Sequence, residues 1–423
     1  MFRKLFCAAS VAVLVACASQ SPKTQTAATP PATSTASKTT LAHYLPDETT
    51  YPVGSVPNAV LHDSARNKDL VMTIEYPTRG GPYPVIVFSH GFGGSNVGYT
   101  PLTEYWAGHG YIVIKPSHAD SGKLGPILEQ RREERRAEME KARAEGRGRN
   151  GRNTKQTTQQ QGQTPTPPDP LAEAIWSTQS TSDWVNRARD ISLILDNLTN
   201  LEKKYPELAG RMDTSKIGVS GHSYGAFTAM MVSGMTSSAA TPAIGAADPR
   251  VKAAVVFSPQ GIGSLGLTKE SWKDVTVPMM YVTGSLDYVT AGDAKPRHDA
   301  FAYSPAGDKF FVSFNGARHM TFAGGTLSDI SDDEIPMRTS NGGGYGGTDP
   351  WGNPQPQMGT RGAGGRGGSS LYQRDRRIFT AAKIASTAFF DAYLKGDTAA
   401  KDYLKPGGTL EAFNSGELTI ERK

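Results

Sequence analysis

Residues 216–231 read KIGVSGHSYGAFTAMM. In this stretch a short apolar run is followed by a serine that has a glycine two positions before it and another two positions after it. The pattern Gly-x-Ser-x-Gly, from Gly221 to Gly225, is typical of a nucleophile that attacks a carbonyl carbon, because the flanking glycines permit a sharp strand-to-helix turn. In a chain with 46 glycines, chance alone produces this pattern about 0.4 times. The motif therefore makes Ser223 a candidate nucleophile whose surroundings have to support the role.

The two other groups that activate a serine nucleophile follow it in the chain, each just after a predicted strand. Asp287 comes after the apolar run 277–284, and His319 comes after the run 309–316. A histidine beside the serine takes its proton, and an aspartate holds the histidine in the required tautomer. The order Ser, Asp, His at three strand ends predicts a catalytic triad of Ser223, Asp287 and His319.

A glycine-rich turn, HGFGG at 90–94, follows the apolar run 83–88. Such a turn can aim a backbone N–H group at the substrate oxygen that becomes negative during the attack. The second donor in this arrangement is the N–H of the residue after the nucleophile. We therefore expect the backbone N–H groups of Phe92 and Tyr224 to form the oxyanion hole.

Other carboxylates and histidines near these positions compete for the same roles. The competing acids are Asp274, Asp293 and Asp299, and the competing bases are His90, His222 and His298. A turn aspartate is commonly a helix N-cap, and Asp287 is preferred because it directly follows a strand. His90 and His222 fit structural roles beside the oxyanion turn and the serine, whereas His118 either lines the rim of the site or supports its turn. The remaining histidines lack the spacing of metal ligands, so we expect no metal and no cofactor.

Strand-like and helix-like stretches alternate between the motifs. Apolar runs rich in β-branched residues predict strands at 70–77, 83–91, 110–116, 216–220, 251–258, 277–284 and 309–316. The stretch 181–204 has one apolar face and predicts a helix. The alternation predicts an α/β fold with a doubly wound, mostly parallel sheet, whose ligand sites lie at the carboxyl ends of the strands.

With these motifs the chain resembles the α/β-hydrolase superfamily. Within it, the chain is most similar to the branch of platelet-activating-factor acetylhydrolase-like, dienelactone-hydrolase-like and bacterial polyester hydrolases. The stretches that carry the resemblance include PYPVIVFSHGFGGS, HGYIVIKPSHADS, GRMDTSKIGVSGHSYGAFTAM and GARHMTF, and RRIFTAAKIASTAFFDAYLKGD resembles the closing helix of the family. The resemblance implies a serine hydrolase that cleaves carboxylic esters with short-chain acyl, lipid or polyester-like groups.

The chain departs from this branch at two places. Dienelactone hydrolases proper use a cysteine nucleophile, where this chain has Ser223. Eukaryotic acetylhydrolases place the acid after the preceding strand, where this chain reads FSPQG at 257–261 and has no carboxylate. The arrangement is therefore closer to that of the polyester hydrolases.

Two other functions are alternatives to an esterase. One is a serine peptidase of the prolyl-oligopeptidase-like kind, and the other is a catalytically silent envelope lipoprotein. Such peptidases normally carry a large propeller before the hydrolase domain, and the stretch before the first predicted strand is too short for one. A complete triad with its oxyanion turn argues against the silent lipoprotein.

The N-terminus has the pattern of an exported lipoprotein. Two basic residues precede an apolar segment, 5–16, that is too short to cross a bilayer. The segment leads into Leu-Val-Ala-Cys, which resembles the lipobox of bacterial lipoproteins and predicts a signal peptide at 1–16 and lipidation of Cys17. Ala18 after this cysteine favours the outer membrane in the Gram-negative sorting rule; the alternative is an ordinary secretory signal. Because Cys7 lies in the signal, we expect no disulfide in the mature domain.

Segments of biased composition divide the rest of the chain. Residues 17–45 hold the lipidated cysteine and a tether with few apolar residues. The α/β-hydrolase domain is predicted at 46–423, a single domain with a charged insertion at about 124–172 and a Gly-rich loop at about 339–370, both expected to be disordered. Within the first insertion, 129–155 holds ten Lys/Arg and six Glu, which account for most of the net charge of +5.

The charge distribution and the exported location limit the expected partners. Aromatic residues do not interleave the basic ones, so we expect no nucleic acid. The expected partners are a small-molecule, lipid or polymer ester as substrate and the membrane that holds the lipid anchor. We expect the protein to be a monomer.

Overall fold

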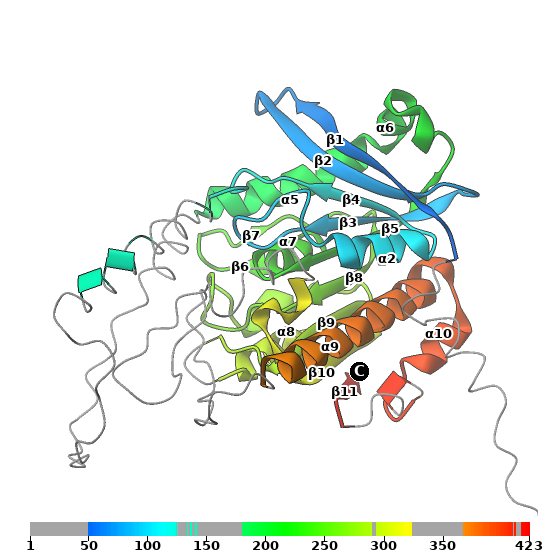
Figure 1. The fold of residues 1–423 in the computed structure, drawn as a ribbon. Coiled ribbons are helices and arrows are strands. Elements are labelled where there is room, and N and C mark those ends of the chain that lie inside the picture. The colour runs from blue at the N-terminus through cyan, green and yellow to red at the C-terminus, as the bar shows by residue number, and fades with distance from the viewer. Residues whose placement is uncertain are drawn as a thin grey trace, which may run out of the picture.

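A nine-stranded sheet with helices on both faces forms the centre of the protein (Figure 1). The computed structural model describes residues 50–123, 180–289, 293–323, 367–408, 410–411 and 416–423, with isolated positions between 125 and 141. The strands of the sheet are β1 (Val53–Asp63), β2 (Lys68–Pro77), β3 (Tyr83–Ser89), β4 (Ile112–Pro116), β5 (Met212–His222), β8 (Val251–Phe257), β9 (Met279–Leu286), β10 (Lys309–Arg318) and β11 (Leu418–Arg422). A separate two-stranded ribbon consists of β6 (Thr236–Ser237) and β7 (Ile244–Gly245).

Helices connect most of the strands. The α-helices are α2 (Thr100–Gly108), α5 (Thr181–Asp196), α6 (Leu198–Lys204), α7 (Tyr224–Val232), α8 (Asp299–Tyr303), α9 (Gly367–Phe390) and α10 (Thr398–Tyr403). Shorter helical turns are η1 (Pro206–Leu208), η2 (Lys269–Trp272), η3 (Lys295–His298), η4 (His319–Ala323) and the π-helical η5 (Asp391–Lys395). None of the helices in the described part of the chain combines the length and apolar character that a membrane span requires.

The order of the strands across the sheet is β1-β2-β4-β3-β5-β8-β9-β10-β11. The strands from β4 to β10 pair in parallel, whereas the pairs β1–β2, β2–β4 and β10–β11 are antiparallel. The predicted α/β fold with a mostly parallel sheet is confirmed. Parallel pairing places the carboxyl ends of β3, β5, β9 and β10 at one edge of the sheet.

Two hydrophobic clusters, one on each face, explain the continuous apolar runs. The first cluster includes side chains of α5, α6 and α7, and the second includes side chains of α2 and α9. In β3, Val85 and Val87 belong to the first cluster. Ile86 and Phe88, which alternate with them, belong to the second. A central strand covered on both faces therefore has no polar position to interrupt its pattern.

The structure departs from the predicted elements in its edge strands, in one helix and in the short ribbon of β6 and β7, which was not predicted. The antiparallel edge strands β1 and β11 were not predicted. The single helix expected at 181–204 is divided at Asn197, whose φ of −115° is not helical. The predicted signal peptide and tether, and nearly all of the charged insertion and the Gly-rich loop, lie outside the described residues.

Candidate active site

The turn that carries Ser223 joins β5 directly to α7. β5 ends at His222, α7 begins at Tyr224, and Ser223 between them has φ 56° and ψ −120°. Residues other than glycine rarely adopt a positive φ, so the surroundings must hold this turn in place. The Ser223 N–H donates a 2.9 Å hydrogen bond to the carbonyl of Phe257 at the end of β8. This bond fixes the serine at the edge of the sheet.

The glycines on either side of Ser223 allow two backbone segments to touch. A Cβ atom at Gly225 would overlap the carbonyl oxygen of Ser89, the last residue of β3. A Cβ atom at Gly221 would overlap the carbonyl of Gly225. Neither glycine has a positive φ, so the absent side chain, and not an unusual backbone angle, is what this motif provides.

Ser223, His319 and Asp287 form a continuous chain of hydrogen bonds. The distance from His319 Nε2 to Ser223 Oγ is 2.9 Å, and the distance from His319 Nδ1 to Asp287 Oδ1 is also 2.9 Å. The three side chains are at most 5% exposed. His319 directly follows β10 and Asp287 directly follows β9. With Nδ1–H donating to the carboxylate, Nε2 is the acceptor for the Ser223 hydroxyl proton.

Asp287 is held as a carboxylate by several neighbours. Thr283 Oγ1 donates to Oδ2 at 2.9 Å, and a terminal nitrogen of Arg297 lies 3.0 Å from Oδ1. Burial opposes the charge, but the Arg297 guanidinium and the His319 imidazole outweigh it and hold the pKa of Asp287 well below its usual value. The acid therefore stays ionised at neutral pH.

Arg297 is a buried residue of this site that the sequence analysis missed. It donates to the carbonyls of Ser258 and Pro259 at 3.0 and 2.9 Å and to the Asp287 carbonyl at 3.2 Å. Its terminal nitrogen also lies 3.1 Å from His319 Nδ1. Arg297 therefore joins the loops that follow β8 and β9. Its polar sequence context, AKPRHD, gives no signal of this role.

The competing acids have other contacts. Asp293 Oδ1 accepts from the Lys295 N–H at 2.9 Å, as a turn cap does. Asp299 Oδ2 accepts from the Ile262 N–H at 2.9 Å. Asp274 forms an exposed ion pair with its neighbour along the chain. The structure places Asp287, and none of these three, against His319.

His222 is a buried support of the site. Its Nε2 lies 2.8 Å from the His319 carbonyl, and its Nδ1 lies 2.9 Å from the Tyr99 hydroxyl. Burial, followed by the nearby His319, lowers the pKa of His222 to about 3. A neutral imidazole is therefore available to donate to the His319 backbone. His118 is buried too, and so it supports the turn and does not line a rim.

The two residues whose backbone N–H groups were expected to form the oxyanion hole, Phe92 and Tyr224, lie in neighbouring turns. Phe92 lies in the turn after β3, and Tyr224 is the first residue of α7. Their rings are 6.3 Å apart, so the two turns lie side by side. Neither N–H donates to another of the described residues. Tyr224 also places its N–H at a helix N-terminus, where the helix dipole favours negative charge.

Sheet topology and site together define the class of the protein. A mostly parallel sheet with a serine on a sharp strand-to-helix turn, followed in the chain by an aspartate and a histidine at later strand ends, is the α/β-hydrolase fold. The family model described as platelet-activating factor acetylhydrolase, isoform II, matches residues 64–327, and the chain belongs to this family. The family resemblance predicted from the motifs is confirmed. Members of the family are hydrolases that act on esters. A search of the curated proteins found no match.

Replacing Gly225 with alanine tests the contact between the two turns. We expect Gly225→Ala to lower the free energy of unfolding by about 3 kcal/mol, because the added methyl group meets the rigid backbone at Ser89. Gly98→Ala is the matched control, since its Cβ atom would lie at an ordinary 3.5 Å from the Ser95 carbonyl oxygen. Urea denaturation followed by circular dichroism measures both variants. Equal stability of the two would contradict this interpretation of the motif.

Proposed function

We propose that this protein is a serine hydrolase that cleaves carboxylic esters through an acyl-enzyme. The observation that carries the proposal is the hydrogen-bonded chain from Asp287 through His319 to Ser223. Membership in a family of ester hydrolases supports an ester as the group that Ser223 attacks. The substrates that fit are short-chain acyl, lipid or polyester-like esters.

The first half of the reaction transfers the acyl group to the enzyme. His319 Nε2 takes the Ser223 proton as Oγ attacks the ester carbonyl carbon. The negative charge on the carbonyl oxygen is stabilised by the N–H groups of Phe92 and Tyr224, and each such donor lowers the barrier by about 3 kcal/mol. The intermediate collapses when His319 returns the proton to the leaving alcohol.

The second half of the reaction releases the acid. A water molecule gives a proton to His319 and attacks the acyl carbon, and the same N–H groups stabilise the second oxyanion. This intermediate collapses as the bond to Ser223 Oγ breaks and His319 returns the proton to that oxygen, which frees the acid and restores the serine. Asp287 stabilises the imidazolium in both halves and keeps His319 in the correct tautomer. Each step uses a group of the chain or water, so the mechanism requires no cofactor.

An ester substrate is favoured over the two alternatives. An amide would be the substrate of the peptidase alternative, but the family of this chain acts on esters. A silent lipoprotein would not need an ionised, buried acid beside its histidine, since burying a charge is costly. We therefore propose ester hydrolysis in preference to peptide hydrolysis and to a role without catalysis.

We further propose that the protein is an exported lipoprotein anchored through Cys17. The support is the sequence alone: a basic start, a short apolar segment and Leu-Val-Ala-Cys. These residues lie outside the described part of the chain. The outer membrane is the favoured location, and a membrane-held enzyme would act on esters at the bacterial envelope.

Removing the nucleophile should abolish catalysis and preserve the fold. Ser223→Ala is expected to lose roughly 10⁴-fold or more in kcat on a short-chain p-nitrophenyl ester, because no acyl-enzyme can form. The variant should also lose labelling by a fluorophosphonate, while near-UV circular dichroism stays that of the wild type. Turnover like that of the wild type would overturn the proposed function. Faster cleavage of aminoacyl anilides than of esters by the wild type would favour the peptidase.

The choice of acid is tested by an isosteric change. Asp287→Asn should lower kcat by about 10²–10⁴-fold, because the imidazolium loses its counter-charge and the tautomer becomes wrong. Asp293→Asn is the matched control, and its kcat should stay within a few-fold of the wild type. Steady-state kinetics on the same ester gives both values. A loss in Asp293→Asn as large as that in Asp287→Asn would show that the acid is misassigned.

Lipidation can be tested with the two cysteines of the chain. Cys17→Ser should remain unacylated and leave the detergent phase when membranes are partitioned with detergent. Cys7→Ser, within the apolar segment, is the matched control and should partition like the wild type. Metabolic labelling with a fatty acid provides a second measurement. A Cys17→Ser variant that stays with the membrane and carries the label would place the anchor elsewhere.

A further inference from the structure

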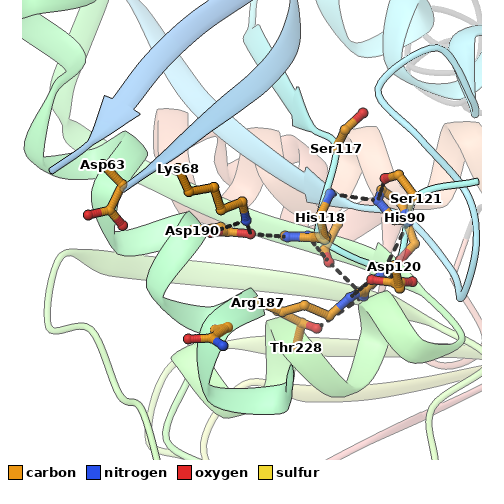
Figure 2. Close-up of polar contacts among 12 residues, drawn as sticks. Asp63, Lys68, His90, Ser117, His118, Asp120, Ser121, Arg187, Asp190 and Thr228 are labelled. Carbon is orange, nitrogen blue, oxygen red and sulfur yellow. Dashed lines mark hydrogen bonds and ion pairs between the residues drawn. The ribbon is translucent and has the colours of Figure 1, made fainter. Parts of the chain in front are cut away.

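A second cluster of buried polar side chains, most of which Figure 2 labels, forms hydrogen bonds to the turn that carries Phe92. Its members come from the end of β3 and the turn after it, the segment after β4, and helices α5 and α7. They are Ser89, His90, His118, Asp120, Arg187, Asp190 and Thr228, each at most 7% exposed. The mechanism above uses none of these side chains, so their arrangement calls for its own explanation.

Three consecutive backbone amides in the turn differ in their hydrogen bonding. The Gly91 N–H donates to the Tyr99 hydroxyl at 3.2 Å, and the Gly93 N–H donates to Asp120 Oδ2 at 2.9 Å. The Phe92 N–H between them donates to none of the described residues. Buried amides are nearly always paired. A free amide between two bonded ones indicates a position kept open for an acceptor outside the chain.

Arg187 on α5 is the centre of the cluster. Its Nε and Nη2 atoms bind the two carboxylate oxygens of Asp120 at 2.9 and 3.2 Å. Nη1 and Nη2 both donate to the His90 carbonyl at 3.0 Å, and Nη2 lies 3.4 Å from the Gly91 carbonyl. The guanidinium carbon is 4.2 Å from the centre of the Tyr224 ring. One buried cation therefore contacts the oxyanion turn and the residue after the nucleophile.

The pairing of Arg187 with Asp120 fixes the direction of the carboxylate. Burial opposes the charge on Asp120, but the Arg187 guanidinium outweighs it and holds the pKa of Asp120 well below its usual value. Two parallel contacts between a guanidinium and a carboxylate set orientation as well as distance. Burying both charges costs desolvation free energy that an apolar pair would avoid. The orientation that the pair gives to the Asp120 carboxylate therefore explains it better than a contribution to the stability of the fold.

The two histidines of the cluster support the same turn. The His118 N–H donates to His90 Nε2 at 3.1 Å, so His90 carries its proton on Nδ1 and donates to the Gly91 carbonyl at 2.6 Å. His118 links Ser89 Oγ and Asp190 Oδ2, each at 2.9 Å. This serine, histidine and aspartate resemble a second triad, but Ser89 is fully buried. Burial lowers the pKa of both histidines, which are therefore neutral supports.

We propose that Arg187 and Asp120 are positioning residues for the oxyanion hole. Arg187 holds the carbonyls of His90 and Gly91, and Asp120 holds the Gly93 N–H, so that the Phe92 N–H between them stays directed at the oxygen that becomes negative. They act through the backbone and do not touch the substrate. The inference rests on the proposed function, in which Ser223 attacks an ester.

The test compares an oxygen ester with its thionoester, in which sulfur replaces the carbonyl oxygen and accepts hydrogen bonds poorly. Arg187→Met should lower kcat on the oxygen ester by about 10²-fold with KM within a few-fold, because a small displacement of a transition-state donor has this effect. The kcat on the thionoester should fall much less. The ratio of the oxygen-ester rate to the thionoester rate therefore falls. Arg187→Lys keeps the positive charge but lacks the planar guanidinium that binds both carboxylate oxygens, and it should give a ratio between those of the wild type and Arg187→Met.

Two further variants complete the experiment. Arg189→Met is the matched control, because Arg189 is exposed on the same helix, and its rates and ratio should equal those of the wild type. In Asp120→Asn a single acceptor oxygen remains for the Gly93 N–H and Arg187, so the ratio of oxygen-ester to thionoester rates should fall in this variant too. If Arg187→Met does not fold, Asp120→Asn takes its place in the comparison.

The outcomes separate the two proposals. Folding of each variant is verified by near-UV circular dichroism before its rates are compared. If the cluster variants lose the same factor on both esters, the cluster serves stability alone and the positioning role is wrong. If the wild type hydrolyses no ester, or Ser223→Ala is as active as the wild type, the proposed function fails instead.

Discussion

The candidate site depends on the parallel pairing of β3 with β5, which sets Ser89 opposite Gly221. This register brings the two turns at the strand ends into backbone contact. The contact is possible only because Gly221 and Gly225 have no side chains. Once the backbones touch, Ser223 is held at a positive φ and the turn that carries Phe92 lies beside it. The proposed nucleophile and both proposed oxyanion donors thus derive their positions from one packing constraint.

Two buried arginines maintain the loops around that constraint. Arg187 pairs with Asp120 beside the turn after β3, and Arg297 pairs with Asp287 beside the loops after β8 and β9. Each guanidinium also donates to backbone carbonyls, so each fixes the path of the chain as well as the position of a carboxylate. The pKa values of both aspartates lie below their usual range, and both therefore remain charged at neutral pH. Such pairs contribute orientation where apolar packing would contribute only stability.

Much of the fold could be predicted because burial leaves a simple pattern in the sequence. β3 is covered on both faces, and its continuous apolar run identified it. β1 was missed because it contains Pro57 and Asn58 and a bulge between Val56 and Ala59, which an edge strand tolerates and a central strand does not. The division of the helix at Asn197 was missed because the apolar spacing continues past it.

The sequence by itself determined the fold class, the family and the residues Ser223, Asp287 and His319 as candidates. Their types, their order and their places after strands are local properties, and parallel strands bring such positions to one edge. Only the tertiary structure placed Arg187 and Arg297, because their partners are set by three-dimensional packing. Arg187 meets Asp120 across 67 positions of the chain. In sequence both arginines are ordinary charged residues in polar stretches, and they become specific only when packing removes water and leaves one carboxylate within reach.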